Sequence, residues 1–582
     1  METLNSSFLP KQTIPSFKIH QKLNQKLKII TANSCFTTSH PKKNPETLKS
    51  PPTKKRRNQS FLATIFNNLD HLICTFLDPP LRPAIDPNHV LSGSLAPVSE
   101  LPPTPCTVTE GSLPPCLDGA YIRNGPNPHF TPKSRPYHFL DGDGMLHVIK
   151  ISQGKPPTFC CRYVSTHKHA AERDAGYPFV PSVFSSFTCT AASTARAALL
   201  AARVISGQLD PANCGFGAAN TSLALISGRL FALCESDLPY AVELTAEGDL
   251  KTLGRHGFGS AADDPFSTMT AHPKIDPITG EAFAFAYNIA PPFLTFFRID
   301  SGGRKRTNVP IFSMESFSCA HDFAVTANYA VFFDIQITAN PWWILRGRPP
   351  MGADTAKVAR LGIIPRYAED EKDMRWIEAP ELNVLHCVNA WEEDDDAAAI
   401  TMVVSNATSV ENVLERIDLA ELKMEKITVN LETATLERRQ LSKKPLDFAV
   451  INPAYAAKEN RYVYAVILGK QTGIGVVKLD LSMEGGEECT VASRLYGPGC
   501  YGGEPFFVAR DPENSAAEED DGYLVTYVHD ENAQESKFLV MDAKSSTLDI
   551  VAAVKLPQRV PGGFHGLFLS ELELHKIRMA SS

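Results

Sequence analysis

The chain has 582 residues, of which 43% are hydrophobic and 21% charged, and its formal net charge is −8. This composition is ordinary for a globular protein, and the length suits two average domains or one large one. The mildly acidic balance argues against a general nucleic-acid-binding protein, and no uninterrupted apolar run reaches the ~18 residues of a membrane-spanning helix. Thirteen cysteines, none in a C-x-x-C pair, fit neither a disulfide scaffold nor a zinc knuckle, so we expect reduced thiols.

The first 60 residues are strongly basic. They contain twelve lysines and arginines and only two acids, Glu2 and Glu46, and they are rich in hydroxyl and amide side chains. An acid-poor, hydroxyl-rich leader with few arginines is typical of a chloroplast transit peptide, which we predict over residues 1–58. The basic cluster at residues 54–57 would also suit a nuclear signal, but the bias covers the whole leader. We therefore expect a plastid protein.

Residues 59–80 predict an amphipathic helix followed by a linker. Apolar side chains recur at helical spacing from Phe61 to Leu77, and Pro79 and Pro80 end the pattern. One interpretation is a helix that packs on the domain that follows. The other is an interfacial helix whose apolar face dips into lipid, at a membrane or plastoglobule surface. The sequence leaves both interpretations open.

From about residue 115 onward, the chain predicts many short strands. Apolar runs of five to eight residues alternate with Gly, Asn, Asp and Pro, as at 222–226 with 229–234, 282–287 with 293–299, and 461–468 with 473–479. Paired strands of this kind indicate an all-β domain over residues 81–582, either a β-propeller or a large barrel. The alanine-rich segment 191–205 predicts one inserted helix. No WD or kelch signature repeats at a fixed period, so no blade count follows from the pattern.

Four of the sixteen histidines share a local context. Each of them adjoins an apolar strand or a tight turn: His272, His321, His386 and His565, at separations of 49, 65 and 179 residues. Local zinc motifs space their ligands by only a few residues, so these four can converge only if successive groups of strands point them at a common axis. From spacing alone, surface or core histidines are the more ordinary interpretation.

Several sequence blocks are typical of one protein family. The blocks are LDGAYIRNGPNP at 117–128, FLDGDGMLH at 139–147, ESDLPY at 235–240, AHPKIDP at 271–277, NAWE at 389–392, GGEP at 502–505 and GFHGL at 563–567. In this order they resemble the carotenoid cleavage oxygenases, most closely the class-four carotenoid cleavage dioxygenases of plastids. The resemblance spans residues 85–582. It implies a seven-bladed β-propeller with a helical cap over an axial metal site.

The resemblance also implies the contents of that site. The four metal-binding histidines of the family map onto His272, His321, His386 and His565, with Fe(II) as the metal. Four neutral imidazoles suit Fe(II), and an octahedral ion keeps two positions open for O2 and for water or substrate.

The family also holds its histidines with acidic residues, which map onto Glu235, Asp447 and Glu504. A ligating imidazole usually gives its other N–H to such an acceptor. Asp447 stands where many relatives have glutamate, and the missing methylene shortens its reach by about 1.5 Å. Either the backbone moves in or a water bridges the gap.

The implied reaction inserts both atoms of O2 across one double bond of a carotenoid or apocarotenoid, giving two carbonyl products. Class-four resemblance implies cleavage at the 9,10 or 9′,10′ bond, which releases a C13 ketone such as β-ionone. The alternative within the family is 9-cis-epoxycarotenoid cleavage at the 11,12 bond, on the route to abscisic acid. A non-catalytic propeller that binds carotenoids or partner proteins and a zinc hydrolase on the same fold are alternatives of other classes.

Overall fold

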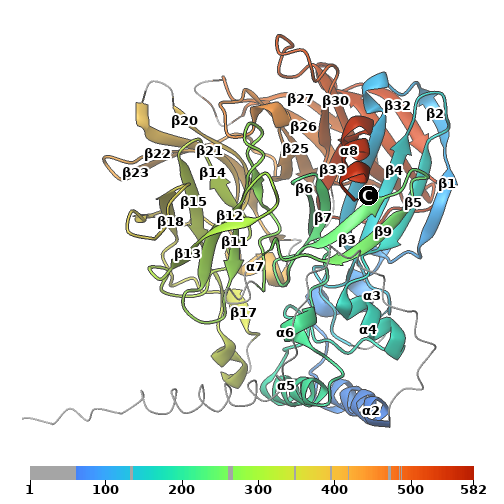
Figure 1. Cartoon of the computed structure of the whole chain (residues 1–582), viewed down its shortest axis with the longest axis vertical. Helices are drawn as coiled ribbons and strands as arrows, with labels where there is room; N and C mark the ends of the chain where they lie inside the picture. Colours follow the sequence, from blue (N-terminus) through green and yellow to red (C-terminus); the bar gives the residue numbers. More distant parts are fainter. Residues whose placement is uncertain are drawn as a thin grey trace, which may run out of the picture. The chain divides into compact units, whose positions relative to one another are not determined.

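Antiparallel β-strands are the predominant regular secondary structure of the described residues in the computed structural model (Figure 1). The structure describes residues 61–131, 135–259, 267–346, 349–393, 396–416, 419–469, 473–483, 486 and 488–581. They belong to one compact unit, Asn58–Ser582. The leader predicted over residues 1–58 lies outside the described residues. The mostly β architecture expected from the sequence is confirmed.

Four sheets each consist of four strands that are close in sequence. The first two are β6 (Ser222–Ile226), β7 (Arg229–Leu233), β8 (Tyr240–Leu244) and β9 (Leu250–Arg255), then β10 (Lys274–Ile275), β11 (Ala282–Tyr287), β12 (Leu294–Ile299) and β13 (Lys305–Ile311). The next two are β14 (Phe323–Val325), β15 (Tyr329–Asp334), β18 (Arg360–Pro365) and β19 (Arg375–Glu378), then β20 (Val384–Glu393), β21 (Asp396–Ala407), β22 (Leu422–Asn430) and β23 (Thr435–Gln440). A small sheet pairs β16 (Ile337–Ala339) with β17 (Met351–Ala353).

Strand β11 illustrates why these runs fold as they do. Successive side chains of a strand point to opposite faces, so its sequence AFAFAY places small residues on one face and large ones on the other. Ala282 and Ala284 pack in one core cluster, whereas Phe283 and Phe285 pack in another. Both faces of the sheet are therefore buried against apolar neighbours.

The two ends of the described chain meet in shared sheets. In a five-stranded sheet, β1 (Leu101–Pro105), β5 (Thr158–Tyr163), β4 (Asp143–Ile151) and β3 (Gly119–Asn127) are followed by the C-terminal strand β33 (Gly566–Ser570). Residues 119–123 of β3 pair with residues 566–570 of β33. This pairing brings the segment before β33 beside the N-terminal strands.

A ten-stranded sheet contains the remaining strands. It runs from β2 (Thr107–Gly111) through β32 (Ile550–Lys555), β31 (Glu535–Asp542), β30 (Gly522–Asp530), β28 (Cys500–Gly502), β26 (Gly473–Asp480) and β25 (Tyr462–Leu468) to β24 (Leu446–Val450). Strand β27 (Thr490–Leu495) pairs with β26, and β29 (Phe506–Ala509) pairs with β30. Sheets built from successive strands are what a propeller requires. The number of seven blades stays a prediction.

Helices are few and mostly short. They are α2 (Phe61–Phe76), η1 (Pro83–Ile85), α3 (Pro87–Val90), η2 (Gly93–Leu95), η3 (Pro115–Leu117), α4 (His167–Ala175), α5 (Thr190–Ile205), α6 (Pro211–Cys214), η4 (Pro341–Arg346), α7 (Val410–Glu415), η6 (Pro453–Tyr455) and α8 (Glu571–Ser581). The alanine-rich helix predicted from the sequence is α5. Helix α2 lies beside it (Figure 1). Within the described ranges, none of the helices has the length and apolarity to span a membrane.

Candidate metal centre

The four histidines singled out in the sequence stand at the beginning of strands that lie on the edges of their sheets. His272 precedes β10 by two residues, and His321 precedes β14 by two residues. His386 is the third residue of β20, and His565 immediately precedes β33. Strands β10, β14, β20 and β33 are each the terminal strand of a different sheet. An edge strand has no neighbour on one side, so four separate sheets can present one imidazole each to a shared space.

The structure brings the four imidazoles together. One ring nitrogen from each histidine can be chosen so that all four atoms lie within 4.8 Å of one another. The Nε2 atoms of His272 and His321 are 3.0 Å apart. The ring centroid of His565 is 4.6 Å from that of His272 and 5.0 Å from that of His386. Residues separated by up to 293 positions in the sequence (565 − 272) thus form one cluster.

A carboxylate lies behind three of the four rings. Nδ1 of His321 is 2.6 Å from Oε1 of Glu235. Nδ1 of His386 is 2.8 Å from Oδ1 of Asp447, and Nδ1 of His565 is 2.9 Å from Oε1 of Glu504. An ionised carboxylate can only accept a hydrogen bond, so Nδ1 of His386 and of His565 is placed to donate its proton, and the His321 Nδ1 lies within ion-pair distance of its carboxylate. The lone pair of the His386 and His565 rings is then on Nε2, on the side away from the carboxylate.

Asp447 reaches His386 directly, without the bridging water that its shorter side chain made conceivable. The backbone moves in at this point: the register of β24 against β25 shifts between Asp447 and Val450. Phe448 has a φ of 49°, in the left-handed region that a bulky residue rarely adopts. Its ring packs 5.4 Å from His386 and 5.5 Å from His565, measured between centroids. The bulge therefore positions both the Asp447 carboxylate that contacts His386 and the Phe448 ring that packs beside the two imidazoles.

Burial and neighbouring charges set the protonation of the cluster. Burial, followed by the surrounding imidazoles, holds the pKa of His272 well below its usual value. Burial alone would lower the pKa of His386 and raise those of Glu235 and Asp447. The attraction between each histidine and its carboxylate outweighs burial, so the pKa of His386 is raised, and the pKa values of both carboxyls are lowered. The carboxyls are accordingly ionised, and His272 is neutral, near pH 7.

The donor set fits a divalent transition metal. Nε2 of His386 is buried and has no hydrogen-bond partner among the described residues. A buried polar atom without a partner is unusual in a folded protein, and here it faces three other imidazoles. Converging imidazole nitrogens are ligands suited to iron, copper, nickel or zinc. The residues present can therefore hold one such ion.

Two charged residues beside the histidines were not predicted as site residues. The described contacts of the His272 ring are with the other imidazoles, not with a carboxylate. Lys274 follows it by two residues, and its ammonium lies 2.8 Å from Oδ1 of Asp322, the residue after His321. The sequence did hold a signal for both residues, because each is a charged residue close to a candidate ligand. Lys274 follows His272 by two residues, and Asp322 follows His321 directly.

Comparison with known proteins identifies the family. Residues 95–570 match the sequence family described as retinal pigment epithelial membrane protein, RPE65. The Arabidopsis thaliana protein named "Probable carotenoid cleavage dioxygenase 4, chloroplastic" is 55% identical over 537 residues, covering 91% of this chain and 89% of that protein. The Oryza sativa subsp. japonica protein named "9-cis-epoxycarotenoid dioxygenase NCED1, chloroplastic" is 51% identical over 524 residues, covering 88% of this chain and 81% of that protein.

Solved structures with low sequence identity share the fold. Lignostilbene dioxygenase from Pseudomonas brassicacearum is 22% identical, with a TM-score of 0.68 over 84% of this chain and 100% of that chain. A mutant of the Synechocystis apocarotenoid oxygenase is 24% identical, with a TM-score of 0.67 over 84% of this chain and 99% of that chain. Taken with the identity to the plant enzymes over most of its length, the family match means that this chain belongs to the RPE65 family of carotenoid cleavage oxygenases and is a dioxygenase.

Proposed function

We propose that the protein uses O2 at a ferrous ion to cleave one double bond of a carotenoid or apocarotenoid into two carbonyl products. The observation that carries this proposal is the cluster of four imidazoles within 4.8 Å, three of them backed by carboxylates. In this proposal His272, His321, His386 and His565 bind Fe(II), and Glu235, Asp447 and Glu504 orient the rings of three of them. When bound, Fe(II) would act as a Lewis acid toward an oxygen ligand and would also be able to give an electron to O2.

The side chains of this chain have positioning rather than nucleophilic roles in that reaction. Glu235, Asp447 and Glu504 keep the Nδ1 proton of their partner rings and so direct the Nε2 lone pairs inward. The four ligands are neutral, so they leave the charge of a divalent ion uncancelled. The Phe448 ring packs beside both His386 and His565 and gives that side of the cluster an apolar neighbour. No side chain needs to form a covalent bond with the substrate.

The proposed position of cleavage is the 9,10 or 9′,10′ bond, with release of a C13 ketone such as β-ionone. Relatives named carotenoid 9,10(9′,10′)-cleavage dioxygenases from Phaseolus vulgaris and Crocus sativus are 36% and 38% identical to this chain. The second candidate is cleavage of a 9-cis-epoxycarotenoid at the 11,12 bond, which the 51% identity to the rice 9-cis-epoxycarotenoid dioxygenase favours. The two reactions differ in substrate and in the length of each product.

The test is an incubation of the purified, iron-loaded protein with β-carotene and, separately, with 9-cis-violaxanthin under O2. Mass spectrometry of the products distinguishes the bonds, because 9,10 cleavage gives a C13 ketone and 11,12 cleavage gives a C15 aldehyde. A C13 ketone supports the proposal, and a C15 aldehyde from 9-cis-violaxanthin alone supports the second candidate. Iron-dependent binding of both carotenoids without any product would contradict both and favour a non-catalytic carotenoid-binding protein.

We also propose a lipid surface as the place where the substrate is met. Helix α2 turns polar side chains inward: Asn67 accepts a hydrogen bond from Arg203, and Asp70 accepts one from Tyr177. Ile73 packs in a small core with α5, but most of the large apolar side chains face outward, including Phe61 and Phe76, which are 81% and 74% exposed. An exposed apolar face of this kind suits a helix that dips into a lipid monolayer. Carotenoids are apolar and dissolve in such a phase.

The cellular location and the blade arrangement complete the proposal. Two relatives with 55% and 51% identity are named as chloroplastic, which supports a plastid protein whose residues 1–58 are a transit peptide. The candidate lipid surface is then a plastoglobule or a plastid membrane. The ten-stranded sheet would count as two blades joined through β28, which with the five-stranded sheet and the four four-stranded sheets gives seven blades over residues 81–582, and the two-stranded sheet would not count as a blade. The helices before β6 would form the cap over the metal axis.

A further inference from the structure

One buried carboxylate connects three of the strands that carry histidines. Asp322 is 2% exposed. Its Oδ1 accepts a hydrogen bond of 2.7 Å from the backbone N–H of Phe323 and lies 2.8 Å from Nζ of Lys274. Its Oδ2 accepts a hydrogen bond of 2.7 Å from the backbone N–H of Cys387. The carboxylate thus bonds to groups on β10, β14 and β20 at once.

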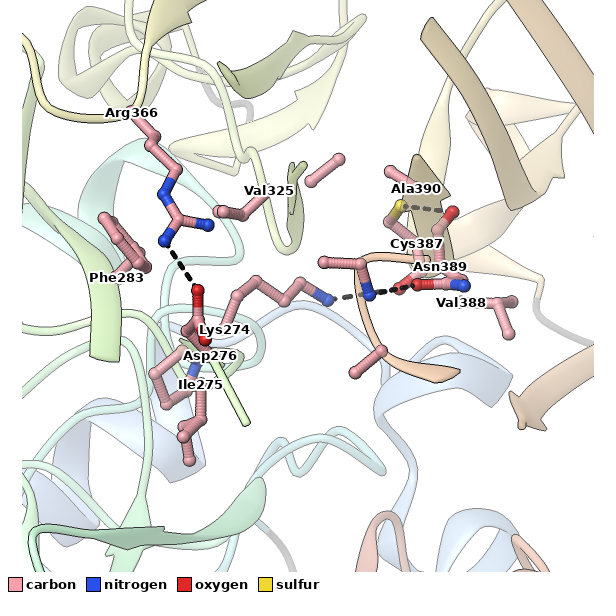
Figure 2. A pocket seen from close by; sticks show the side chains of 14 residues that line it. Lys274, Ile275, Asp276, Phe283, Val325, Arg366, Cys387, Val388, Asn389 and Ala390 are labelled. Carbon is pink, nitrogen blue, oxygen red and sulfur yellow. Dashed lines mark hydrogen bonds and ion pairs between the residues drawn. The ribbon is translucent and has the colours of Figure 1, made fainter. Parts of the chain in front are cut away.

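Lys274 adds a second link between the same strands. Its ammonium donates to the backbone carbonyl oxygen of Cys387 at 3.1 Å, across the space between β10 and β20 (Figure 2). Lys274 is two residues from His272, Asp322 is next to His321, and Cys387 is next to His386. Each link therefore acts within two residues of a candidate metal ligand, although neither charged side chain belongs to the histidine cluster itself.

Side-chain packing does not fill this part of the molecule. A cavity of about 160 Å³ borders Lys274 and Cys387, and its wall also includes Asp276 and Arg366, which form an ion pair (Figure 2). Beside a cavity, strand spacing cannot be set by close-packed side chains alone. The ion pair joins a buried carboxylate to a lysine side chain that is 28% exposed, and with its backbone hydrogen bonds it links these strands directly. A pair with one buried member is better evidence for a defined geometry than for added stability.

His272, whose ring has no carboxylate among its described contacts, stands two residues before Lys274. A ligating imidazole normally donates its second N–H to an acceptor that fixes its orientation, as Glu235, Asp447 and Glu504 do for the other three rings. His272 is held by its backbone N–H, which donates to Oγ1 of Thr270 at 3.1 Å, and through Lys274 by the Asp322 carboxylate. Its position therefore depends on how its strand is anchored.

We propose that Asp322 and Lys274 are positioning residues of the metal centre, which set the spacing of the His272, His321 and His386 strands and serve His272 as the three carboxylates serve the other rings. The inference rests on the proposed four-histidine metal site. Loss of the contacts of Asp322 and Lys274 would move His272 relative to the other three ligands. Both the affinity for a metal ion and the symmetry of the ligand field then change, whether or not substrate is present.

The experiment titrates metal-free, full-chain protein with Co²⁺ and records the visible absorption spectrum together with a chelator competition. Lys274→Met removes the ammonium, and Lys274→Arg keeps the charge as the conservative variant. Lys478→Met is the matched control, because Lys478 is a buried lysine that pairs with Asp520 and donates to the carbonyl oxygen of Ala543 at 3.0 Å in another sheet. Thermal unfolding of each variant separates loss of stability from loss of metal geometry.

The expected result is a Co²⁺ affinity about 10-fold or more lower in Lys274→Met, in the range found for residues that orient metal ligands, with a changed visible spectrum. Lys274→Arg recovers most of the affinity, and Lys478→Met lowers stability while leaving affinity and spectrum as in the wild type. A folded Lys274→Met variant with wild-type affinity and spectrum overturns the inference.

If the Lys274→Met variant does not fold, the Co²⁺ affinity of the Asp322→Asn variant is the test of the inference. Its amide group keeps the shape of the side chain and one acceptor oxygen but turns an NH2 toward the Cys387 amide. Reduced Co²⁺ affinity supports the inference, and unchanged affinity overturns it. Wild-type protein that binds no Co²⁺ through its histidines would instead refute the metal site itself, so the two failures are distinguishable.

Discussion

The histidine cluster and the outer face of helix α2 distribute polar and apolar groups in opposite ways. In the cluster, polar side chains are gathered inside the protein, and three of the four rings are held by buried or half-buried carboxylates. On α2, most of the large apolar side chains are exposed, while Asn67 and Asp70 are turned inward and hydrogen-bonded. Both regions depart from the usual partition of polar groups to the surface and apolar groups to the core.

The two unusual distributions of polar and apolar groups point to two different ligands. Burying polar groups requires a partner for each of them, and Nε2 of His386 has none among the described residues, which indicates a metal ion. Exposing apolar groups requires something to cover them, and for α2 the proposed cover is lipid. The two regions should therefore respond independently to mutation, and each variant below is expected to affect one of them and spare the other.

The largest effect is expected from His321→Ala. The variant removes one of four ligands and leaves the Glu235 carboxylate without its partner. Bound iron, measured by mass spectrometry of the purified protein, should fall to a small fraction, and cleavage should drop more than the roughly 10–100-fold typical of residues that only orient a ligand. Vesicle binding should not change. His575→Ala, at an exposed position of α8, is the control. Full iron retention in His321→Ala would remove this residue from the ligand set.

The Arg196→Met variant should weaken the attachment of helix α2 to helix α5. Arg196 and Asp78 form an ion pair with side-chain exposures of only 2% and 3%, which ties α5 to the end of α2. Removing one member of a buried pair costs about 3–5 kcal/mol. Hydrogen exchange in α2 should accelerate by a corresponding factor while iron content stays constant. Arg173→Met, in an exposed pair with Asp174, should change exchange little. Slow exchange in α2 of the Arg196 variant would mean that other contacts hold the helix.

Asp447→Asn should weaken the cluster without dismantling it. The amide cannot accept the His386 Nδ1 proton with the strength of a carboxylate, so the ring loses its fixed orientation. Metal affinity or the cleavage rate should fall about 10–100-fold. The control is Asp249→Asn, because Asp249 pairs with Arg162 outside the histidine cluster. Equal kinetics for the wild type and Asp447→Asn would show that the contact with His386 has no part in catalysis.

The smallest effect is expected on the lipid side. A Phe61→Ser/Phe76→Ser double variant should bind vesicles of neutral plastid-type lipid about 10-fold more weakly, because each aromatic ring loses its burial in the lipid. Its iron content and its cleavage of a water-soluble apocarotenoid should not change. The matched control is Ile278→Ser/Ile289→Ser, at loop positions that are 81% and 83% exposed. Equal co-sedimentation of both double variants would contradict a specific lipid contact of α2.

Much of the fold could be predicted because its information is local. Alternating runs such as residues 282–287 specify a strand by themselves, and the alanine-rich run specifies α5 through helix propensity. The pairing of β3 with β33 could not be predicted in this way, because it joins residues more than 440 positions apart. No local pattern encodes that pairing, nor does one show that β24 to β32 join into one sheet.

The residues of the site also fall into those that could be predicted from the sequence and those that could not. The four histidines and the three carboxylates came from the family resemblance, and the geometry now places all seven in one cluster. The bulge at Phe448 was not predictable, because a phenylalanine gives no signal for a positive φ. Asp322 was also missed, because its role depends on three strands meeting and is not visible in any one of them.

The most direct test of the four-histidine metal site is a crystal structure of the iron-loaded protein with anomalous data collected on both sides of the iron absorption edge. We expect one strong anomalous peak, within bonding distance of a ring nitrogen from each of His272, His321, His386 and His565. A peak bound by only some of these rings, or iron found elsewhere in the molecule, would contradict it.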